Sequence, residues 1–306
     1  MRFSRFVIGL FALLPLSAAD TKDKQRADTP VIGYAFAEAS RELRAILGVP
    51  GSSRWSDALP LPEGVTHLRV ANGHRWALAI SANETAVLFL DSLNDTLNDT
   101  LKSSRLDTAG SMDDAIFSPN GGAVAIRRGA MVTVFTGMPD TPTKSGEFES
   151  NDLAGTALSD TGEAVAIREG RIVKAATGEL VQACPGDCRV AYFPNSSDLA
   201  IFESGRLTEL RGGESRVIAE GLQITEIQQL GAGSSRIGLA SKEKLLVVER
   251  ASGAIAAEEN LSGTDRMEAM RLPGTWLLSA AEESAAWLYS NEGVRFVPAA
   301  ARSKEQ

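Results

Sequence analysis

The sequence predicts an all-β protein built from four-stranded units that repeat about every forty residues. Three segments align without gaps, each with an apolar residue, a polar turn and a short β-prone run: 117–126, 158–167 and 192–201. Apolar triplets in the same phase begin at positions 78, 124, 165, 199, 237 and 276. Turn glycines keep the same spacing at Gly137, Gly178, Gly213 and Gly253. Two markers in phase indicate a true structural repeat.

The segments between these markers have the length and composition of strands. Runs such as 131–135 and 244–248 are short, alternating and rich in β-branched residues. One four-stranded sheet leaves its faces exposed, whereas radial stacking buries each sheet against its neighbours. The repeat therefore predicts a β-propeller of about seven four-stranded blades. Six blades are the alternative, and a pair of β-sandwiches is the non-propeller alternative. We expect the Val-Ala-Ile triplets on the inner strands, where the sheets converge.

The first blade is predicted to be incomplete. Segments 31–36 and 42–47 resemble the run 246–253, which is the outer half of a later repeat. Six full repeats follow them. This half-blade is expected either to complete a seventh blade or to close the ring by strand exchange, which removes exposed sheet edges. The propeller domain is assigned to residues 31–299, followed by a tail at 300–306.

Two turns carry a resemblance to a known group of repeats. Ser118-Pro119-Asn120-Gly121 and Ser159-Asp160-Thr161-Gly162 are each followed by an Ala-Val-Ala-Ile run. They resemble the "SPDG" turn of TolB-like and WD40-like propeller repeats, and the resemblance covers roughly residues 65–299. No Trp-Asp pair ends a strand, and Gly73-His74 resembles the WD40 Gly-His pair only once and out of register. The resemblance therefore implies the fold and no binding residue.

The first nineteen residues have the pattern of a signal peptide. Arg2 and Arg5 precede an apolar run from Phe6 to Leu14, and small residues stand before Asp20. An uncleaved membrane anchor is the alternative, but such an anchor needs about 20 apolar residues. We expect an exported protein, periplasmic or secreted, with a flexible lead-in at 20–30. No later apolar run predicts a transmembrane segment after signal removal.

Composition excludes several classes of partner and cofactor. The formal net charge of −8 argues against nucleic-acid binding. Two His and two Cys are too few for a Cys/His zinc cluster. We therefore predict no metal and no cofactor, and a partner that is an unidentified protein or envelope component.

The two cysteines are expected to form a local disulfide. Cys184 and Cys188 flank a Pro-Gly turn, which lets the two sulfurs approach. Free thiols are one alternative and a redox or metal role is another. The redox reading would want a Cys-x-x-Cys spacing, which the pair lacks.

Catalytic motifs are sparse, and no catalytic residue is predicted. His67 and His74 are the only imidazoles, and no Gly-x-Ser-x-Gly motif accompanies them. His74 is expected in an exposed turn. The glycine-rich run 231–238 precedes a strand, so it is interpreted as a strand turn and not as a dinucleotide loop. The carboxylate pairs Asp113-Asp114 and Glu282-Glu283 suit glycosidases in principle, but are interpreted as solvated turn charges.

One long loop is the candidate contact site for a partner. Residues 91–101 contain a tandem Leu-Asn-Asp-Thr, and the candidate residues are Asp91, Asn94, Asp95, Asn98 and Asp99. The segment is interpreted as a solvated loop, and calcium binding is the alternative, although the EF-hand spacing is missing. The sequence favours an exported scaffold that binds a protein or ligand and has no chemistry of its own. The alternative is a hydrolase or lyase with its site in the axial channel, which would need acids or bases from the inner strands. Those positions are expected to carry Ala, Val, Ile, Leu and Ser.

Overall fold

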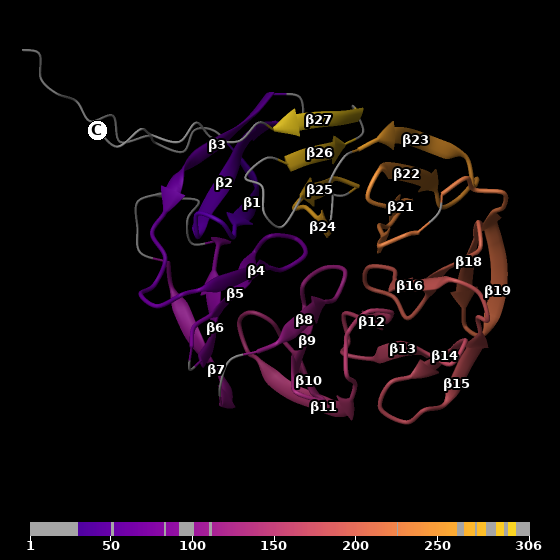
Figure 1. Cartoon of the computed structure of the whole chain (residues 1–306), viewed down its shortest axis with the longest axis horizontal. Coiled ribbons are helices and arrows are strands. Elements are labelled where there is room, and N and C mark those ends of the chain that lie inside the picture. Colours follow the sequence, from indigo (N-terminus) through magenta and orange to yellow (C-terminus); the bar gives the residue numbers. More distant parts are fainter. Residues whose placement is uncertain are drawn as a thin grey trace, which may run out of the picture.

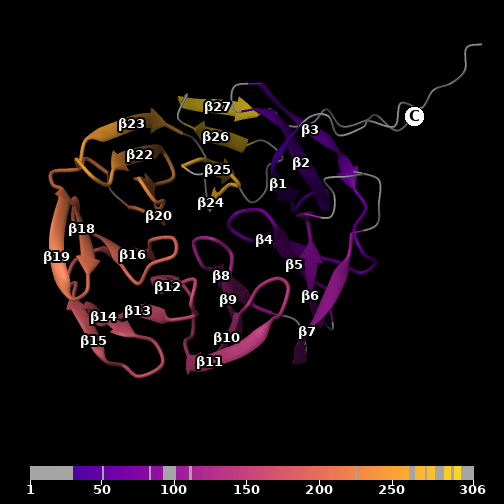
Figure 2. The ribbon, with the colours of Figure 1, turned by 180° about the vertical axis from the view of Figure 1, so that it is seen from behind.

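The computed structural model describes residues 30–49, 52–82, 84–91, 101–109, 112–224, 226–261, 266–272, 274–279, 286–290 and 293–297. Within these ranges the chain forms seven antiparallel sheets, which stand radially around a central axis (Figures 1 and 2). The seven-bladed, all-β architecture predicted from the repeat is confirmed. None of the described segments is a helix long and apolar enough to cross a membrane.

Six of the sheets have four strands each, paired in chain order. Blade 2 contains β4 (His67–Val70), β5 (Trp76–Ile80), β6 (Glu84–Phe89) and β7 (Ser103–Ala109). Blade 3 contains β8 (Asp114–Phe117), β9 (Ala123–Arg128), β10 (Met131–Thr136) and β11 (Thr143–Glu149). Blade 4 contains β12 (Thr156–Leu158), β13 (Ala164–Arg168), β14 (Arg171–Lys174) and β15 (Leu180–Ala183).

Blades 5 to 7 repeat this order. Blade 5 contains β16 (Cys188–Tyr192), β17 (Leu199–Glu203), β18 (Arg206–Arg211) and β19 (Glu214–Ala219). Blade 6 contains β20 (Gln229–Ala232), β21 (Arg236–Ala240), β22 (Lys244–Glu249) and β23 (Ile255–Asn260). Blade 7 contains β24 (Arg266–Ala269), β25 (Trp276–Ser279), β26 (Ala286–Ser290) and β27 (Gly293–Val297). In blades 2 to 7 the first strand lies next to the axis, and its turn to the second strand lies at one end of the ring, here named the turn face. The other end is named the opposite face.

The core lies between neighbouring blades. One cluster joins Leu43 and Ala45 of the first sheet to Leu68 and Leu88 of blade 2, and each further pair of neighbours shares a cluster of the same kind. Each sheet thus buries both faces, which removes apolar surface from water and stabilises the ring.

The Val-Ala-Ile triplets occupy the second strand of their blades and not the innermost one, which corrects the expectation from sequence. Val124, Ala125 and Ile126 lie on β9, paired with β8 on one side and β10 on the other. All three are buried. The second strand is the fully enclosed one, whereas an innermost strand has one edge on the axial channel and can carry polar side chains.

The described residues of blade 1 form three strands, β1 (Val31–Ala37), β2 (Glu42–Val49) and β3 (Ser52–Leu59). β1 runs in the opposite direction to the first strands of the other blades. Its early residue Tyr34 contacts His74 at the turn face, while Glu38, just after its end, pairs with Arg266 at the opposite face. β1 to β3 therefore match the second, third and fourth strands of a blade, which agrees with the outer-half match in the sequence. Among the described residues no strand is exchanged between blades 7 and 1, and β27 lies against β3.

Candidate functional site

The first-to-second-strand turns of blades 3 and 4 are capped by buried serines. Ser118 Oγ accepts a hydrogen bond from the Ala123 amide, and Ser159 Oγ accepts one from the Glu163 amide, both at 2.9 Å. Gly121 has a φ of 74°, and a Cβ at this position would collide with the carbonyl oxygen of Asn72. Serine at the first position and glycine at the fourth thus have separate physical reasons in this turn.

Three of these turns are hydrogen-bonded to one another. The Asp160 carboxylate of blade 4 accepts two backbone hydrogen bonds. One comes from the backbone N–H of Asn120 in blade 3, at 3.0 Å, and the other from the backbone N–H of Asn195 in blade 5, at 2.6 Å. Asn120 Nδ2 also donates to Asn195 Oδ1 at 2.9 Å. The acidic residue of one turn therefore fixes the turns on both of its sides.

Asn72 extends this chain of contacts to blade 7. Its Nδ2 donates to the Ser118 carbonyl at 3.0 Å, and its Oδ1 accepts from the Ala269 amide at 3.1 Å. The Gly73 amide donates to the Ala269 carbonyl at 2.8 Å. The turns of blades 7, 2, 3, 4 and 5 thus form one hydrogen-bonded rim, and the turns of blades 7 and 2 meet directly across blade 1.

A recess of about 420 Å³ opens on the turn face inside this rim. Its charged wall consists of Asp91 between two guanidinium groups: Arg75 Nε lies 2.8 Å and Arg271 Nη2 lies 2.6 Å from the carboxylate oxygens. The bond to Asp91 raises the pKa of Arg75 above its ordinary value. Leu272 also lines the recess, and 41% of its surface is exposed. The recess therefore combines an exposed apolar side chain with oriented charges.

The candidate contact residues from sequence meet this recess at one point. Asp91 lines it, held by the two arginines. Asn94, Asp95, Asn98 and Asp99 lie outside the described residues. In the described part of the chain, no group of three or more His, Cys, Asp or Glu is placed to hold a metal ion.

His74 is fully buried, which corrects the expectation of an exposed turn residue. Its Nδ1 accepts a hydrogen bond from the Tyr34 amide at 2.9 Å, and its carbonyl accepts bonds from Arg271 at 3.0 and 3.2 Å. Burial, with a smaller effect of the Arg271 charge, lowers the pKa of His74 to about 3. The neutral imidazole therefore serves as a structural acceptor for the edge of β1. His67, at the start of β4, is exposed near the opposite face.

The axial channel forms a second cavity, of about 410 Å³, lined by the innermost strands. Its polar groups gather toward the opposite face. Arg69 pairs with Asp114 at 3.1 Å, and Arg266 pairs with Glu38 at 2.6 Å. These charged residues contradict the expectation that the inner positions carry Ala, Val, Ile, Leu and Ser. That expectation placed the repeated apolar triplet on the innermost strand, whereas the triplet lies on the second strand. The charged pattern Arg-x-Glu at 266–268 was the signal available in the sequence.

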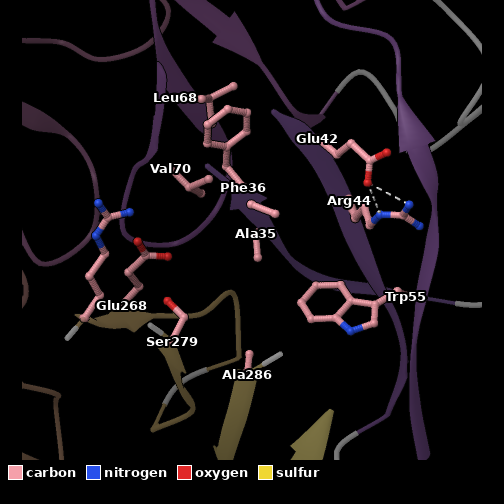
Figure 3. Close-up of a pocket in the computed structure, with 12 residues that line it drawn as sticks. Ala35, Phe36, Glu42, Arg44, Trp55, Leu68, Val70, Glu268, Ser279 and Ala286 are labelled. Carbon is pink, nitrogen blue, oxygen red and sulfur yellow. Dashed lines mark hydrogen bonds and ion pairs between the residues drawn. The ribbon is translucent and has the colours of Figure 1, made fainter. Parts of the chain in front are cut away.

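Four charged side chains line the described part of the channel: Arg69, Asp114, Arg266 and Glu268. Of these, Glu268 is the one for which the described residues provide no hydrogen bond. It lines both the channel and a smaller cavity of about 30 Å³ behind it. Figure 3 shows its carboxyl group pointing from β24 toward Val70 and β1. Desolvation raises the pKa of Glu268 to about 7, although the positive charges of Arg266 and Arg69 oppose the shift. A carboxyl group with such a pKa can gain or lose a proton near neutral pH.

The remaining sequence candidates have structural roles. Cys184 and Cys188 are buried and form a disulfide between blades 4 and 5, with Cα atoms 6.1 Å apart. Asp113 accepts from the Gly129 amide at 2.6 Å, while its neighbour Asp114 pairs with Arg69, so the two carboxylates serve different contacts. Residues 233–235 form the turn between β20 and β21, which confirms a strand turn in the run 231–238. Glu282 and Glu283 lie outside the described residues.

No family model matches the sequence, and no curated protein matches it. Solved structures do match its shape. Hsv2p of Kluyveromyces lactis aligns over 87% of this chain and 97% of its own, with 13% identity and a TM-score of 0.52. PorZ of Porphyromonas gingivalis aligns over 90% of this chain with 12% identity and a TM-score of 0.53. The aligned part is 38% of the PorZ chain, so this chain spans well under half of PorZ.

The fold is a seven-bladed β-propeller. The matching structures support this conclusion at identities that show the fold alone. PorZ is described as an essential bacterial surface component of the type-IX secretion system. A propeller suits binding through its faces in general, but the fold does not fix the partner.

Proposed function

We propose that this protein is an exported scaffold that binds a protein partner through its turn face and has no chemistry of its own. The observation that carries the proposal is the hydrogen-bonded rim around the recess that holds Leu272, Arg75 and Asp91. Because the rim is fixed by contacts between blades, its surface is preorganised and loses little conformational entropy on binding. An apolar centre with charged neighbours is also the composition of many protein interfaces.

Export is supported by three observations. The first nineteen residues have signal-peptide chemistry, and the Cys184–Cys188 disulfide suits an oxidising compartment. PorZ, which shares the fold, is described as a surface component. We expect N-terminal sequencing of the exported protein to begin at or next to Asp20. An intact Met1 in the exported protein would contradict this proposal.

The scaffold role can be tested by changing the recess without changing the core. The exporting cell's envelope fraction is passed over wild-type protein, Leu272→Glu and the control Ile255→Glu, which alters an exposed residue of the outer strand β23. We expect wild type and control to retain the same partner and Leu272→Glu to lose it, with all three melting alike. Equal capture by Leu272→Glu would show that the recess is not the contact surface.

The alternative, a hydrolase or lyase in the channel, is favoured by one observation. Glu268 is a half-buried carboxyl group in the channel, and its pKa of about 7 suits general acid–base catalysis. Screening with chromogenic esters and glycosides would test this reading. Turnover that disappears in Glu268→Gln would establish it and overturn the scaffold proposal.

A further inference from the structure

Blade 1 lacks an innermost strand among the described residues, and its place is a slot between β24 and β4. The slot consists of a cavity of about 30 Å³ together with the adjoining side of the 410 Å³ axial channel, and the two cavities share Val70, Arg266 and Glu268. Its other walls include Ala35 and Phe36 of β1 and, farther out, Trp55 and Ala286 (Figure 3). Every other blade fills the equivalent position with a strand of three to five residues.

The inner edge of β1 is open toward this slot. Among the described strands β1 pairs with β2 alone, so the backbone groups on its other side point toward the axis. One of them, the Tyr34 amide, is already bonded to His74. Since alternate residues of a strand present their backbone groups to the same side, those of Phe36 face the slot as well. His74 therefore marks the closed end, and the free edge lies toward the opposite face.

Glu268 is the charged group of the slot with the weakest compensation. Arg44 is paired with Glu42, Arg69 with Asp114 and Arg266 with Glu38, so Glu268 only shares the positive charges of Arg69 and Arg266 with the acidic partners of those arginines. A carboxylate that is partly removed from water is stabilised when a cation or several hydrogen-bond donors approach it. A strand edge next to such a group is suited to an extended segment that carries a positive charge.

We propose that the slot binds a short extended segment of a partner protein, which adds to β1 as the innermost strand of blade 1. The segment enters from the opposite face, because the turns of blades 7 and 2 close the slot at the turn face. Small residues suit the narrow cavity, and one Lys or Arg pairs with Glu268. Backbone pairing supplies affinity and the charged side chain supplies specificity, as in other cases of strand addition. This inference rests on the proposed scaffold function and adds to it a second contact site, at the opposite face, for a partner segment of stated chemistry.

The test uses the full-length protein and the peptide acetyl-Ala-Lys-Ala-Val-amide, followed by calorimetry and amide hydrogen exchange. We expect saturable binding below about 5 mM and slowed exchange of the Phe36 amide on binding. The same peptide with Glu in place of Lys should bind about tenfold more weakly or not at all, because a charge pair of roughly 1.4 kcal/mol corresponds to a factor of ten. A peptide N-methylated at its backbone should lose binding, since it cannot pair with a strand edge.

Two protein variants complete the test. Glu268→Gln should weaken the Lys peptide about tenfold and leave the Glu peptide no weaker, whereas Glu214→Gln, an exposed residue of the outer strand β19, should change neither. Equal binding of the Lys and Glu peptides, or no binding by a protein that melts normally, would overturn the proposal. Binding that appears only after truncation at Val297 would also overturn it, because the chain's own residues would then fill the slot.

The outcome separates this inference from the scaffold function. Leu272 lies on the turn face, so Leu272→Glu should leave peptide binding unchanged. If the peptide does not bind while partner capture still depends on Leu272, the slot proposal is wrong and the scaffold proposal is supported. If the peptide binds while capture ignores Leu272, the partner uses the slot and not the recess.

Discussion

The rim over blades 3 to 5 and the contact region between blades 7, 1 and 2, here named the seam, both join neighbouring blades. They do so through different kinds of residue. In the rim, the repeated turn itself provides the contacts, since Asp160 binds the equivalent turn residues Asn120 and Asn195. At the seam, single unrepeated residues do this work: His74 bonds the edge of β1, and Arg271 joins His74 to Asp91. Repetition makes a rigid frame, and its interruption leaves buried polar groups and an edge of β1 that pairs with no other described strand. Functional candidates therefore gather where the repeat is weakest.

The largest expected effect comes from breaking the seam at Tyr34. This side chain is fully buried, and its hydroxyl donates to the Leu90 carbonyl at 2.9 Å. Tyr34→Ala should lower the free energy of unfolding by about 3–5 kcal/mol through the lost burial and the cavity left behind. Tyr34→Phe, which removes only the hydrogen bond, should cost about 1 kcal/mol. Urea unfolding measures both, and equal small losses would show that the seam does not stabilise the ring.

The sequence repeat is regular in blades 3 to 5 and weaker in the other blades. This difference explains which features of the fold and of the site could be predicted from the sequence. The blade number, the strand turns and the outer-half match of 31–47 follow from hydrophobic spacing, and the structure agrees with them. Burial of His74 was missed because it depends on β1 reaching the turn of blade 2, a contact across 40 residues that no local pattern encodes. The channel charges were missed because Arg69 and Glu268 lie in the repeats whose turns depart from the consensus.

The second prediction concerns the pH dependence of the free energy of unfolding, which we expect to come from His74 at the seam. The folded state lowers the pKa of His74 from 6.5 to about 3, so between these values the unfolded chain binds the additional proton. The stability that this neutral histidine provides is therefore complete above pH 6.5 and is lost as the pH falls toward 3. His74→Asn keeps an acceptor and tolerates the positive φ of 50°. Between pH 7 and pH 4, wild type should lose about 3 kcal/mol relative to this variant.

Chemical unfolding of the two proteins across this pH range measures the difference. Parallel stability curves would mean that the imidazole titrates normally, and the seam would then lack its proton-sensitive group. Asp160→Asn in the rim is the control, and it should leave the pH difference in place.

The third prediction concerns the disulfide, which lies in the regular part of the ring. Cys184 and Cys188 close a loop of only five residues, so their bond should contribute roughly 2 kcal/mol in the chain-entropy model. Non-reducing mass spectrometry of the exported protein should find the pair two hydrogens lighter than two thiols. Reduction should lower the melting temperature without changing partner capture. Two alkylatable thiols in the native exported protein would contradict the bond.

The smallest expected effect sharpens the comparison from the side of the rim. Asp160→Ala removes the acceptor of two backbone amides and should cost about 1–2 kcal/mol, because both amides can turn to water at the exposed turn face. Asp160→Asn retains one acceptor oxygen and should lose about half as much. Hydrogen exchange at Asn120 and Asn195 measures the effect directly and should speed up at both positions together, while the Tyr34 amide at the seam stays protected. Faster exchange at Tyr34 as well would mean that the rim and the seam form one cooperative unit, and the separation between frame and functional region would then be wrong.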